Sequence, residues 1–364
     1  MHFLYEAWNE AQQRRESAFG RLFRLFQELL LHTAGDAQEA LHWLTQLDRH
    51  YRLTDPDYGI GDFIEELQER GYLREEEPGR VQLTPKSERS LRQRSLEEVF
   101  SKLRKRGLGR HPTPHLGLGE EPQPETRPWQ FGDNVQHIDH QETFRNAFRR
   151  YGLEDFRLDE ETIAVRETDH HASTATVLLL DVSHSMVLYG EDRITPAKKV
   201  ALALAELITS QYPQDKLDII AFGNEAWPVA IRDLPYLEVG PYYTNTLAAL
   251  ERARQILRRR RGMNKQIVLI TDGKPSAMFI GGRLYKNPYG LDRRIVNRVL
   301  DAAIRCRREQ ITITTFMVAR DAYLQAFVHE FTRLNQGRAY YAALDKLGEY
   351  VLEDFIRNRR KRVR

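Results

Sequence analysis

The chain has 364 residues, enough for two domains of ordinary size, and 41% of them are hydrophobic. Its 55 basic and 52 acidic residues give a net charge of 55 − 52 = +3, which argues against a dedicated binder of polyanions. The single cysteine, Cys306, excludes an intrachain disulfide framework, and we interpret it as a buried, inert thiol. We see no signal peptide and no apolar run of membrane-spanning length, so we expect a cytoplasmic protein without membrane contact.

Residues 1–106 are predicted to form a mostly helical domain. Apolar residues recur at three- and four-residue spacing between Leu22 and Leu30 and again between Leu41 and Leu47. A third helix is expected over Ile60 to Arg70, ending at Gly71. Two short strands around a turn and a long helix follow, over Tyr72–Arg74, Val81–Thr84 and Pro85–Arg104. Three helices followed by a two-stranded wing predict a winged-helix-like fold.

Residues 107–173 are predicted to be a linker and an irregular segment. The composition shifts to Gly, Pro, His and Glu from Gly107 to about Arg127, which is typical of a linker or a long loop. One helix is expected inside this segment, over Glu142 to Arg150.

Residues 174–364 are predicted to form an α/β domain, because short apolar runs alternate with helical patterns. The expected strands are Thr176–Leu180, Leu217–Phe222, Ala226–Ile231, Gln266–Thr271, Thr312–Val318 and Arg338–Tyr341. The expected helices are Ile194–Ile208, Leu247–Arg258, Arg293–Arg307, Tyr323–Asn335 and Lys346–Asn358. This alternation specifies a doubly wound, mostly parallel sheet with helices on both faces. Such sheets bind ligands at the carboxyl ends of their strands.

Oxygen-bearing side chains follow two of the apolar strands. The first strand leads into Asp181, Ser183 and Ser185, and the strand ending at Thr271 leads into Asp272-Gly273. Thr244 lies in the loop before the Leu247 helix. Two carboxylates and three hydroxyls suit a hard cation, so we expect Mg²⁺, with Mn²⁺ and Ca²⁺ as alternatives. For the isolated Asp-x-Ser-x-Ser motif, a simple capping loop is an equally good interpretation.

These residues resemble the metal-ion-dependent adhesion site (MIDAS) of von Willebrand factor A (VWA) domains, and the likeness extends over about Thr174 to Arg357. The resemblance implies that Ser183 and Ser185 bind the metal directly, and that Thr244 does so in at least one state. It also implies that Asp181 and Asp272 act mostly through water or through hydrogen bonds to the hydroxyls. One coordination position would stay open for a carboxylate from a partner. Tyr243 stands where the family often has glycine, which leaves the conformation of this loop open.

Other chemistries find less support in the sequence. It contains no GxxxxGK[ST] loop, no HExxH and no GxSxG motif, so we expect no enzymatic activity. An Mg²⁺ site could assist phosphoester cleavage, but no general base accompanies it. The expected winged helix carries Glu65, Glu66 and Glu69, a sign of charge that disfavours nucleic acid. A nucleic-acid-associated regulator that uses this domain and the basic tail at 357–364 remains the alternative.

The overall layout resembles bacterial intracellular proteins that join an N-terminal helical region to a C-terminal VWA domain. These include CoxE-like proteins and the chelatase subunit whose similar domain works with an AAA+ motor. The resemblance implies a partner that presents an acidic residue, either a MoxR-type AAA+ ATPase or its client. The expected function is that of a cation-dependent protein-binding adaptor in complex maturation or metal insertion.

Overall fold

The chain forms two compact units, residues 1–108 together with 173–364, and residues 109–172. The computed structural model describes residues 17–77, 80–105, 126–129, 138–152, 155–166, 173–190, 192–240, 242–272, 274–287, 291–317, 322–341 and 347–359.

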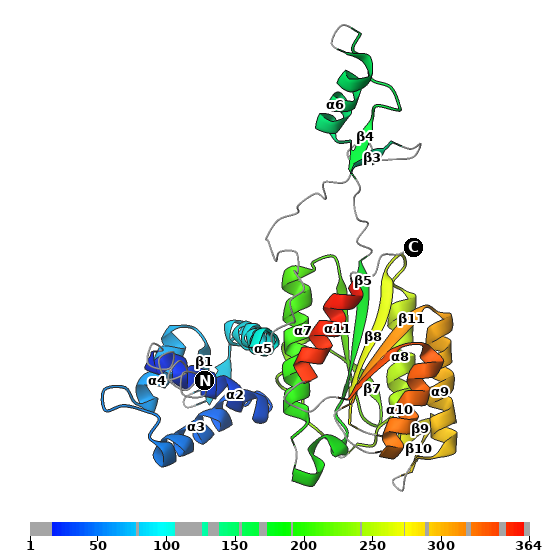
Figure 1. Cartoon of the computed structure of the whole chain (residues 1–364). Coiled ribbons are helices and arrows are strands. Elements are labelled where there is room, and N and C mark those ends of the chain that lie inside the picture. The colour runs from blue at the N-terminus through cyan, green and yellow to red at the C-terminus, as the bar shows by residue number, and fades with distance from the viewer. Residues whose placement is uncertain are drawn as a thin grey trace, which may run out of the picture. The chain divides into compact units, whose positions relative to one another are not determined.

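A six-stranded sheet organises the C-terminal part of the larger unit (Figure 1). Its strand order is β12-β11-β8-β5-β6-β7, and every neighbouring pair is parallel except β6 and β7. The strands are β5 (Thr174–Asp181), β6 (Lys216–Phe222), β7 (Ala226–Val229), β8 (Asn264–Thr271), β11 (Ile311–Met317) and β12 (Arg338–Tyr341). The predicted α/β fold with a mostly parallel sheet is confirmed.

Helices cover both faces of this sheet. Side chains of β5 alternate between two cores, with Leu178 and Leu180 in one and Val177 and Leu179 in the other. The first core contains α7 (Ile194–Gln211) and α11 (Leu347–Arg359). The second contains α8 (Thr246–Arg258) and α9 (Arg293–Arg308), and α10 (Ala322–Asn335) packs beside α9. Burial on both faces explains the continuous apolar run of the central strand. Cys306 is fully buried in the second core, as predicted, and burial raises the pKa of its thiol to about 12.

The N-terminal part of the larger unit is helical and has a core of its own. Its elements are α2 (Ala18–His32), α3 (Ala37–Tyr51), α4 (Ile60–Glu69), β1 (Leu73–Glu77), β2 (Arg80–Leu83) and α5 (Pro85–Lys105). β1 and β2 are antiparallel, and the predicted turn at Pro78-Gly79 between them lies outside the described residues. Gly71 ends α4 with φ +69°, a conformation that favours glycine. This order of elements is the one the sequence predicted.

The helical part packs against the α/β domain through α5. Leu91 and Val99 of α5 belong to the same hydrophobic core as α7 and α11. Gly348 of α11 permits this close approach, because a Cβ there would lie 2.7 Å from Val99 Cγ2. Arg92 of α5 also pairs with Glu206 of α7 at 3.3 Å. The two predicted domains therefore share buried surface.

The smaller unit corrects the prediction that residues 107–173 are only a linker and an irregular segment. Its described residues form β3 (Thr126–Pro128), α6 (His140–Tyr151) and β4 (Ala164–Arg166), with β3 and β4 antiparallel. Asp139 caps α6, and Thr143 Oγ1 accepts a hydrogen bond from Ala164 N at 3.0 Å. Strands of three residues are too short to produce a periodic pattern, which explains why the sequence did not predict them. Most of the Gly- and Pro-rich stretch, residues 106–125, lies outside the described part of the chain.

Candidate metal centre

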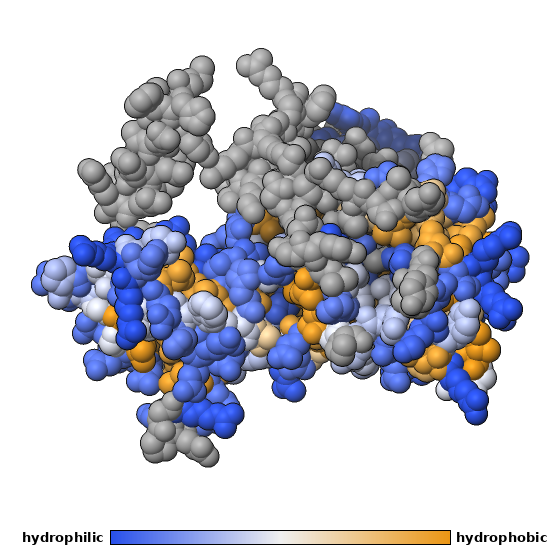
Figure 2. Space-filling view, turned by 90° about the horizontal axis from the view of Figure 1, so that it is seen from below, coloured by the Kyte–Doolittle hydropathy of each residue, from blue (hydrophilic) through white to orange (hydrophobic). Residues whose placement is uncertain are grey.

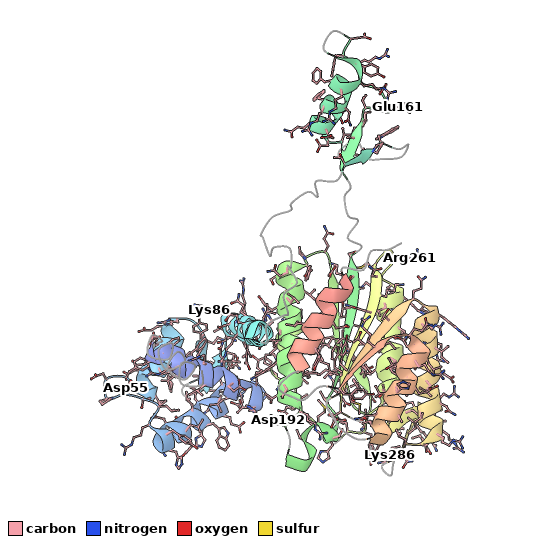
Figure 3. All side chains as sticks on the ribbon, viewed as in Figure 1. Asp55, Lys86, Glu161, Asp192, Arg261 and Lys286 are labelled. Carbon is pink, nitrogen blue, oxygen red and sulfur yellow. The ribbon has the colours of Figure 1, made fainter. Side chains whose placement is uncertain are left out.

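The predicted metal-binding residues lie at the carboxyl end of the sheet, the lower end of the domain in Figure 1. β5 ends at Asp181, and Ser183 and Ser185 follow it. Asp272 follows β8, the parallel neighbour of β5, so both segments leave the sheet at the same edge. Thr244 precedes α8. Asp192 and Lys286, which are labelled in Figure 3, mark the two sides of this end of the domain.

The structure brings the five side chains into one hydrogen-bonded group, which we call the oxygen cluster. Ser183 Oγ lies 3.1 Å from Ser185 Oγ and 3.0 Å from Thr244 Oγ1. Ser185 Oγ donates to Asp272 Oδ1 at 2.7 Å. Asp181 accepts from the Ser183 amide at 2.9 Å and from Thr271 Oγ1 at 2.5 Å. Hydrogen bonds at this site therefore join residues up to 90 positions apart in the chain.

The two carboxylates of the oxygen cluster are buried. Asp181 is 0% exposed and Asp272 is 3% exposed. Burial raises the pKa of Asp181, and the negative charge of Asp272 raises it further. Neither of the hydrogen-bond donors described for Asp181, an amide and a hydroxyl, carries a positive charge. A positively charged group near the cluster would therefore stabilise the ionised form of Asp181.

Arg193 is a charged neighbour of the cluster that sequence reasoning missed. Its Nη1 donates to Asp272 Oδ2 at 2.5 Å, and its side chain is only 13% exposed. Asp272 thus lies between a hydroxyl and a guanidinium, with one oxygen for each. Arg193 directly precedes α7 and belongs to no motif, so no signal in the sequence distinguished it from the many surface arginines. With both carboxylates ionised, the formal charges of Asp181, Asp272 and Arg193 sum to −1 − 1 + 1 = −1.

The distances within the oxygen cluster fit a small divalent cation. Oxygen ligands of octahedral Mg²⁺ lie about 2.1 Å from the ion, which places neighbouring ligands about 3.0 Å apart. For Ca²⁺ the same geometry requires about 3.4 Å. The side-chain oxygens of the cluster are separated by 2.7, 3.0 and 3.1 Å, which are also ordinary O–H···O distances. The hydroxyls and carboxylates of the cluster are ligands that a hard cation such as Mg²⁺ would accept.

The loop that carries Thr244 is held from two sides. Asn224 accepts from the Tyr243 amide at 2.8 Å, and the Asn245 amide donates to Gly223 O at 2.9 Å. Gly223 is required here, because a Cβ would lie 2.6 Å from Cβ of Tyr242. On the other side, the Thr244 amide donates to Ser276 Oγ at 2.9 Å. Tyr243 in the place of the family's glycine therefore leaves the Thr244 hydroxyl beside Ser183.

The oxygen cluster contains no histidine. His184 is exposed, and its amide donates to Tyr242 O at 3.1 Å. His140 is exposed on α6, whereas Gly273, His137, His170 and His171 lie outside the described residues. Within the described ranges, no three His, Cys, Asp or Glu side chains are grouped as metal ligands. The oxygen cluster has only two carboxylates, so hydroxyls would supply the remaining ligands.

No described helix is long and apolar enough to cross a bilayer.

Comparisons with known proteins agree with this fold. The family model for the vWA domain of Rv0959-like proteins matches residues 174–356, and the model for the third domain of the same proteins matches residues 121–168. The chain is 33% identical over 305 residues to Rv0959 of Mycobacterium tuberculosis and to Mb0984 of Mycobacterium bovis. This alignment covers 81% of the chain and 44% of each relative, so the chain spans less than half the length of these proteins.

Solved structures of vWA domains are more distant. A von Willebrand factor type A structure from Catenulispora acidiphila is 16% identical and covers 54% of this chain and 43% of its own, with a TM-score of 0.37. The VWA domain of SpRpn10 is 14% identical, covers 48% of this chain and 94% of its own, and has a TM-score of 0.35. These scores carry no functional argument, so the assignment rests on the family model, which matches half of the chain. The chain belongs to the family of Rv0959-like proteins, and its C-terminal half is their vWA domain.

Proposed function

We propose that the chain is a non-enzymatic adaptor that binds a protein partner through a divalent cation held by the oxygen cluster. The vWA domain itself suggests a role in protein interaction. The observation that carries the proposal is the meeting of three hydroxyls and two buried carboxylates at one strand-end edge. With the neighbouring Arg193, the formal charge of the site is −1. Such an arrangement favours a hard cation over a soft one.

In this proposal Ser183, Ser185 and Thr244 would hold the ion through their hydroxyls. Asp181 and Asp272 would contribute through water or through the hydrogen bonds they make in the cluster. The native ion would be Mg²⁺, with Mn²⁺ the nearer alternative and Ca²⁺ the more distant one. When bound, the ion supplies positive charge and one coordination position for a carboxylate of the partner.

Arg193 determines the charge that a partner would meet. Without Arg193, the formal charges of a divalent ion and the two carboxylates would sum to zero. With Arg193, the sum is −1 − 1 + 1 + 2 = +1, so an anionic side chain is attracted. The salt bridge also occupies one oxygen of Asp272, which keeps that carboxylate directed toward Ser185 through the other. The expected partner therefore presents an aspartate or a glutamate.

A MoxR-type AAA+ ATPase or its client is the proposed partner, and complex maturation or metal insertion in the cytoplasm is the proposed setting. The support is the resemblance of the layout to CoxE-like proteins. The alternative, a nucleic-acid-associated regulator, is less well supported because Glu65, Glu69 and Glu75 are exposed on α4 and β1. Exposed carboxylates oppose contact with phosphates.

Selection of random decapeptides displayed on phage tests the proposal. The full chain is immobilised and the selection is run in parallel with Mg²⁺ and with EDTA. We expect Asp- or Glu-containing peptides to be enriched only with Mg²⁺, and their enrichment to be lost in the double variant Ser183→Ala/Ser185→Ala. Thr209→Ala is the matched control, because it removes a hydroxyl that is bonded within α7. Equal enrichment of acidic peptides in EDTA would remove the metal from the function.

A partner-specific test uses the MoxR-type ATPase of the same organism, purified and mixed with the full chain. We expect co-elution in Mg²⁺ that is lost in EDTA and in the Ser183→Ala/Ser185→Ala variant. Failure to co-elute, while acidic peptides still bind, would reject this partner and keep the cation-dependent site.

A further inference from the structure

A β-hairpin stands next to the oxygen cluster and was not predicted from the sequence. It consists of β9 (Ala277–Ile280) and β10 (Arg283–Lys286), which pair antiparallel with Ile280 opposite Arg283. The two-residue loop between them is Gly281-Gly282, with φ +56° and +79°. Positive φ at both loop residues is the type I′ arrangement, which matches the twist of the two strands. The sequence signal was therefore present as two glycines between short β-prone runs.

The base of the hairpin is joined to the loop that carries Thr244. Besides the bond from the Thr244 amide to Ser276 Oγ, the amides of Ser276 and Ala277 donate back to Thr244 O at 3.0 and 3.3 Å. Lys286, at the end of β10, places its Nζ 4.9 Å from the centre of the Tyr243 ring. The position of the hairpin is thus fixed relative to a proposed metal ligand.

The hairpin is buried at its base and apolar at its exposed end. Ala277 and Met278 are buried, whereas Phe279 is 42% exposed and Ile280 is 48% exposed. Arg283 and Lys286 on the opposite strand are exposed too. Single exposed apolar residues are common on protein surfaces, so their exposure alone indicates nothing. Figure 2 views the molecule from this end and shows hydrophobic residues in several patches among hydrophilic ones.

We propose that the β9–β10 hairpin is a second contact surface for the partner whose carboxylate reaches the oxygen cluster. This inference rests on the proposed function and specifies the partner further. Phe279 shares one face of the hairpin with Leu284, and Ile280 shares the other with Arg283. The partner segment carries an acidic residue for the cluster and an apolar residue for one of these two exposed side chains. Arg283 and Lys286 make acidic neighbours in that segment more favourable than basic ones.

The hairpin extends from a base that is hydrogen-bonded to the Thr244 loop. Ile280 lies three residues beyond Ala277 at that base, which at about 3.3 Å per residue is about 10 Å along the strand. The cation-bound acid alone gives little discrimination between partners, since many proteins expose acids. An apolar contact at a fixed distance adds that discrimination.

The peptide selection described above tests this inference when it is repeated with the double variant Phe279→Ser/Ile280→Ser. In the unmodified chain with Mg²⁺, we expect enriched peptides to carry an apolar residue at a preferred spacing from the acid. In the variant, the acid should remain enriched while the apolar preference disappears. Individual peptides should bind the variant at least about fivefold more weakly, and its Mn²⁺ affinity should stay within about twofold.

Three outcomes separate the two proposals. Enriched acids without an apolar preference in the unmodified chain would overturn the hairpin proposal alone. An apolar preference that persists in the variant would overturn it as well. If Mg²⁺ enriches no acidic peptides at all, the proposed function fails and the hairpin proposal fails with it. Gly282→Ala, which strains the loop at φ +79°, offers a second perturbation that leaves the apolar side chains in place.

Discussion

Two charged groups near the same end of the α/β domain differ in how their carboxylates are neutralised. The first is the oxygen cluster. The second, which we call the contact network, joins Glu28 and His32 of α2 to Asp192 and Lys199 of the α/β domain. In this network His32 Nδ1 lies 3.0 Å from Asp192 Oδ2, and Lys199 Nζ lies 2.7 Å from Glu28 Oε1. Each of these carboxylates faces a basic nitrogen that the chain itself supplies.

The pKa shifts in the two groups run in opposite directions. Burial alone would raise the pKa of Glu28, but hydrogen bonds from His32 and Lys199 outweigh it and lower the value to about 2. Burial likewise opposes the lowering of the pKa of Asp192, which the hydrogen bond from His32 dominates. The pKa of Asp181 is raised instead. The carboxylates of the contact network are therefore already paired with basic groups of the chain. The ionised carboxylates of the oxygen cluster would be further stabilised by a bound cation.

The two groups are adjacent in the chain, because Asp192 belongs to one and Arg193 contacts the other. Asp192 Oδ1 also accepts a hydrogen bond from the Thr195 amide, in the first turn of α7, at 3.0 Å. Substitutions in the two groups should have different consequences, which the following predictions state.

The largest effect is expected for Asp181→Asn, which removes a buried charge and keeps the side-chain volume. We expect its affinity for Mn²⁺, measured by isothermal titration calorimetry, to fall by at least about 100-fold, or about 2.7 kcal/mol. Glu28→Gln is the matched control, because it removes a carboxylate from the contact network. Its Mn²⁺ affinity should be unchanged, and an equal loss in both variants would contradict the distinction between the groups.

An effect of opposite sign is expected for Arg193→Gln. Loss of the positive charge should tighten Mn²⁺ binding by about tenfold, or about 1.4 kcal/mol, because the cation no longer faces a guanidinium. Binding of acidic peptides should weaken in the same variant, because the loaded site then sums to zero. Arg92→Gln, which breaks a salt bridge between α5 and α7, serves as control. If metal and peptide affinity both rose or both fell in Arg193→Gln, the proposed effect of the Arg193 charge would be refuted.

The smallest effect concerns pH. Hydrogen bonds to Asp192 and then Glu28 raise the pKa of His32 to about 9 from its ordinary value of 6.5. Since the folded-state value is the higher one, this contact contributes fully to stability below about pH 6.5 and is lost as the pH rises through about 9. The His32 side chain is 47% exposed, so solvent screening limits the contribution to about 1 kcal/mol.

Urea unfolding at pH 6 and pH 9.5 measures this contribution. The unmodified chain should lose about 1 kcal/mol more between the two pH values than His32→Gln does, and comparing the two chains cancels the other titrating groups. The same pH change should leave the Mn²⁺ affinities of the two chains equal. Identical pH profiles of stability would show that His32 is not held charged in the contact.

The sequence predicted the α/β domain well because buried parallel strands and amphipathic helices have strong periodic patterns. The residues of the oxygen cluster were predicted because Asp181 ends one such strand and Asp272 follows another. Arg193 was not, because its contact with Asp272 spans 79 positions and depends on how α7 begins. The packing of α5 on α7 was not predicted either. The apolar spacing of Leu91 and Val99 shows that α5 has a buried face, but it does not show which element covers that face. The β9–β10 hairpin could have been predicted from Gly281-Gly282.

The most direct test is a crystal structure of the full chain soaked in Mn²⁺, with anomalous scattering recorded near the manganese absorption edge. We expect one anomalous peak at the carboxyl end of β5, about 2.2 Å from the Ser183 and Ser185 hydroxyls. We also expect Arg193 to stay within reach of Asp272. A map with no peak there, at a Mn²⁺ concentration well above the dissociation constant from calorimetry, would contradict a cation-binding role for these residues.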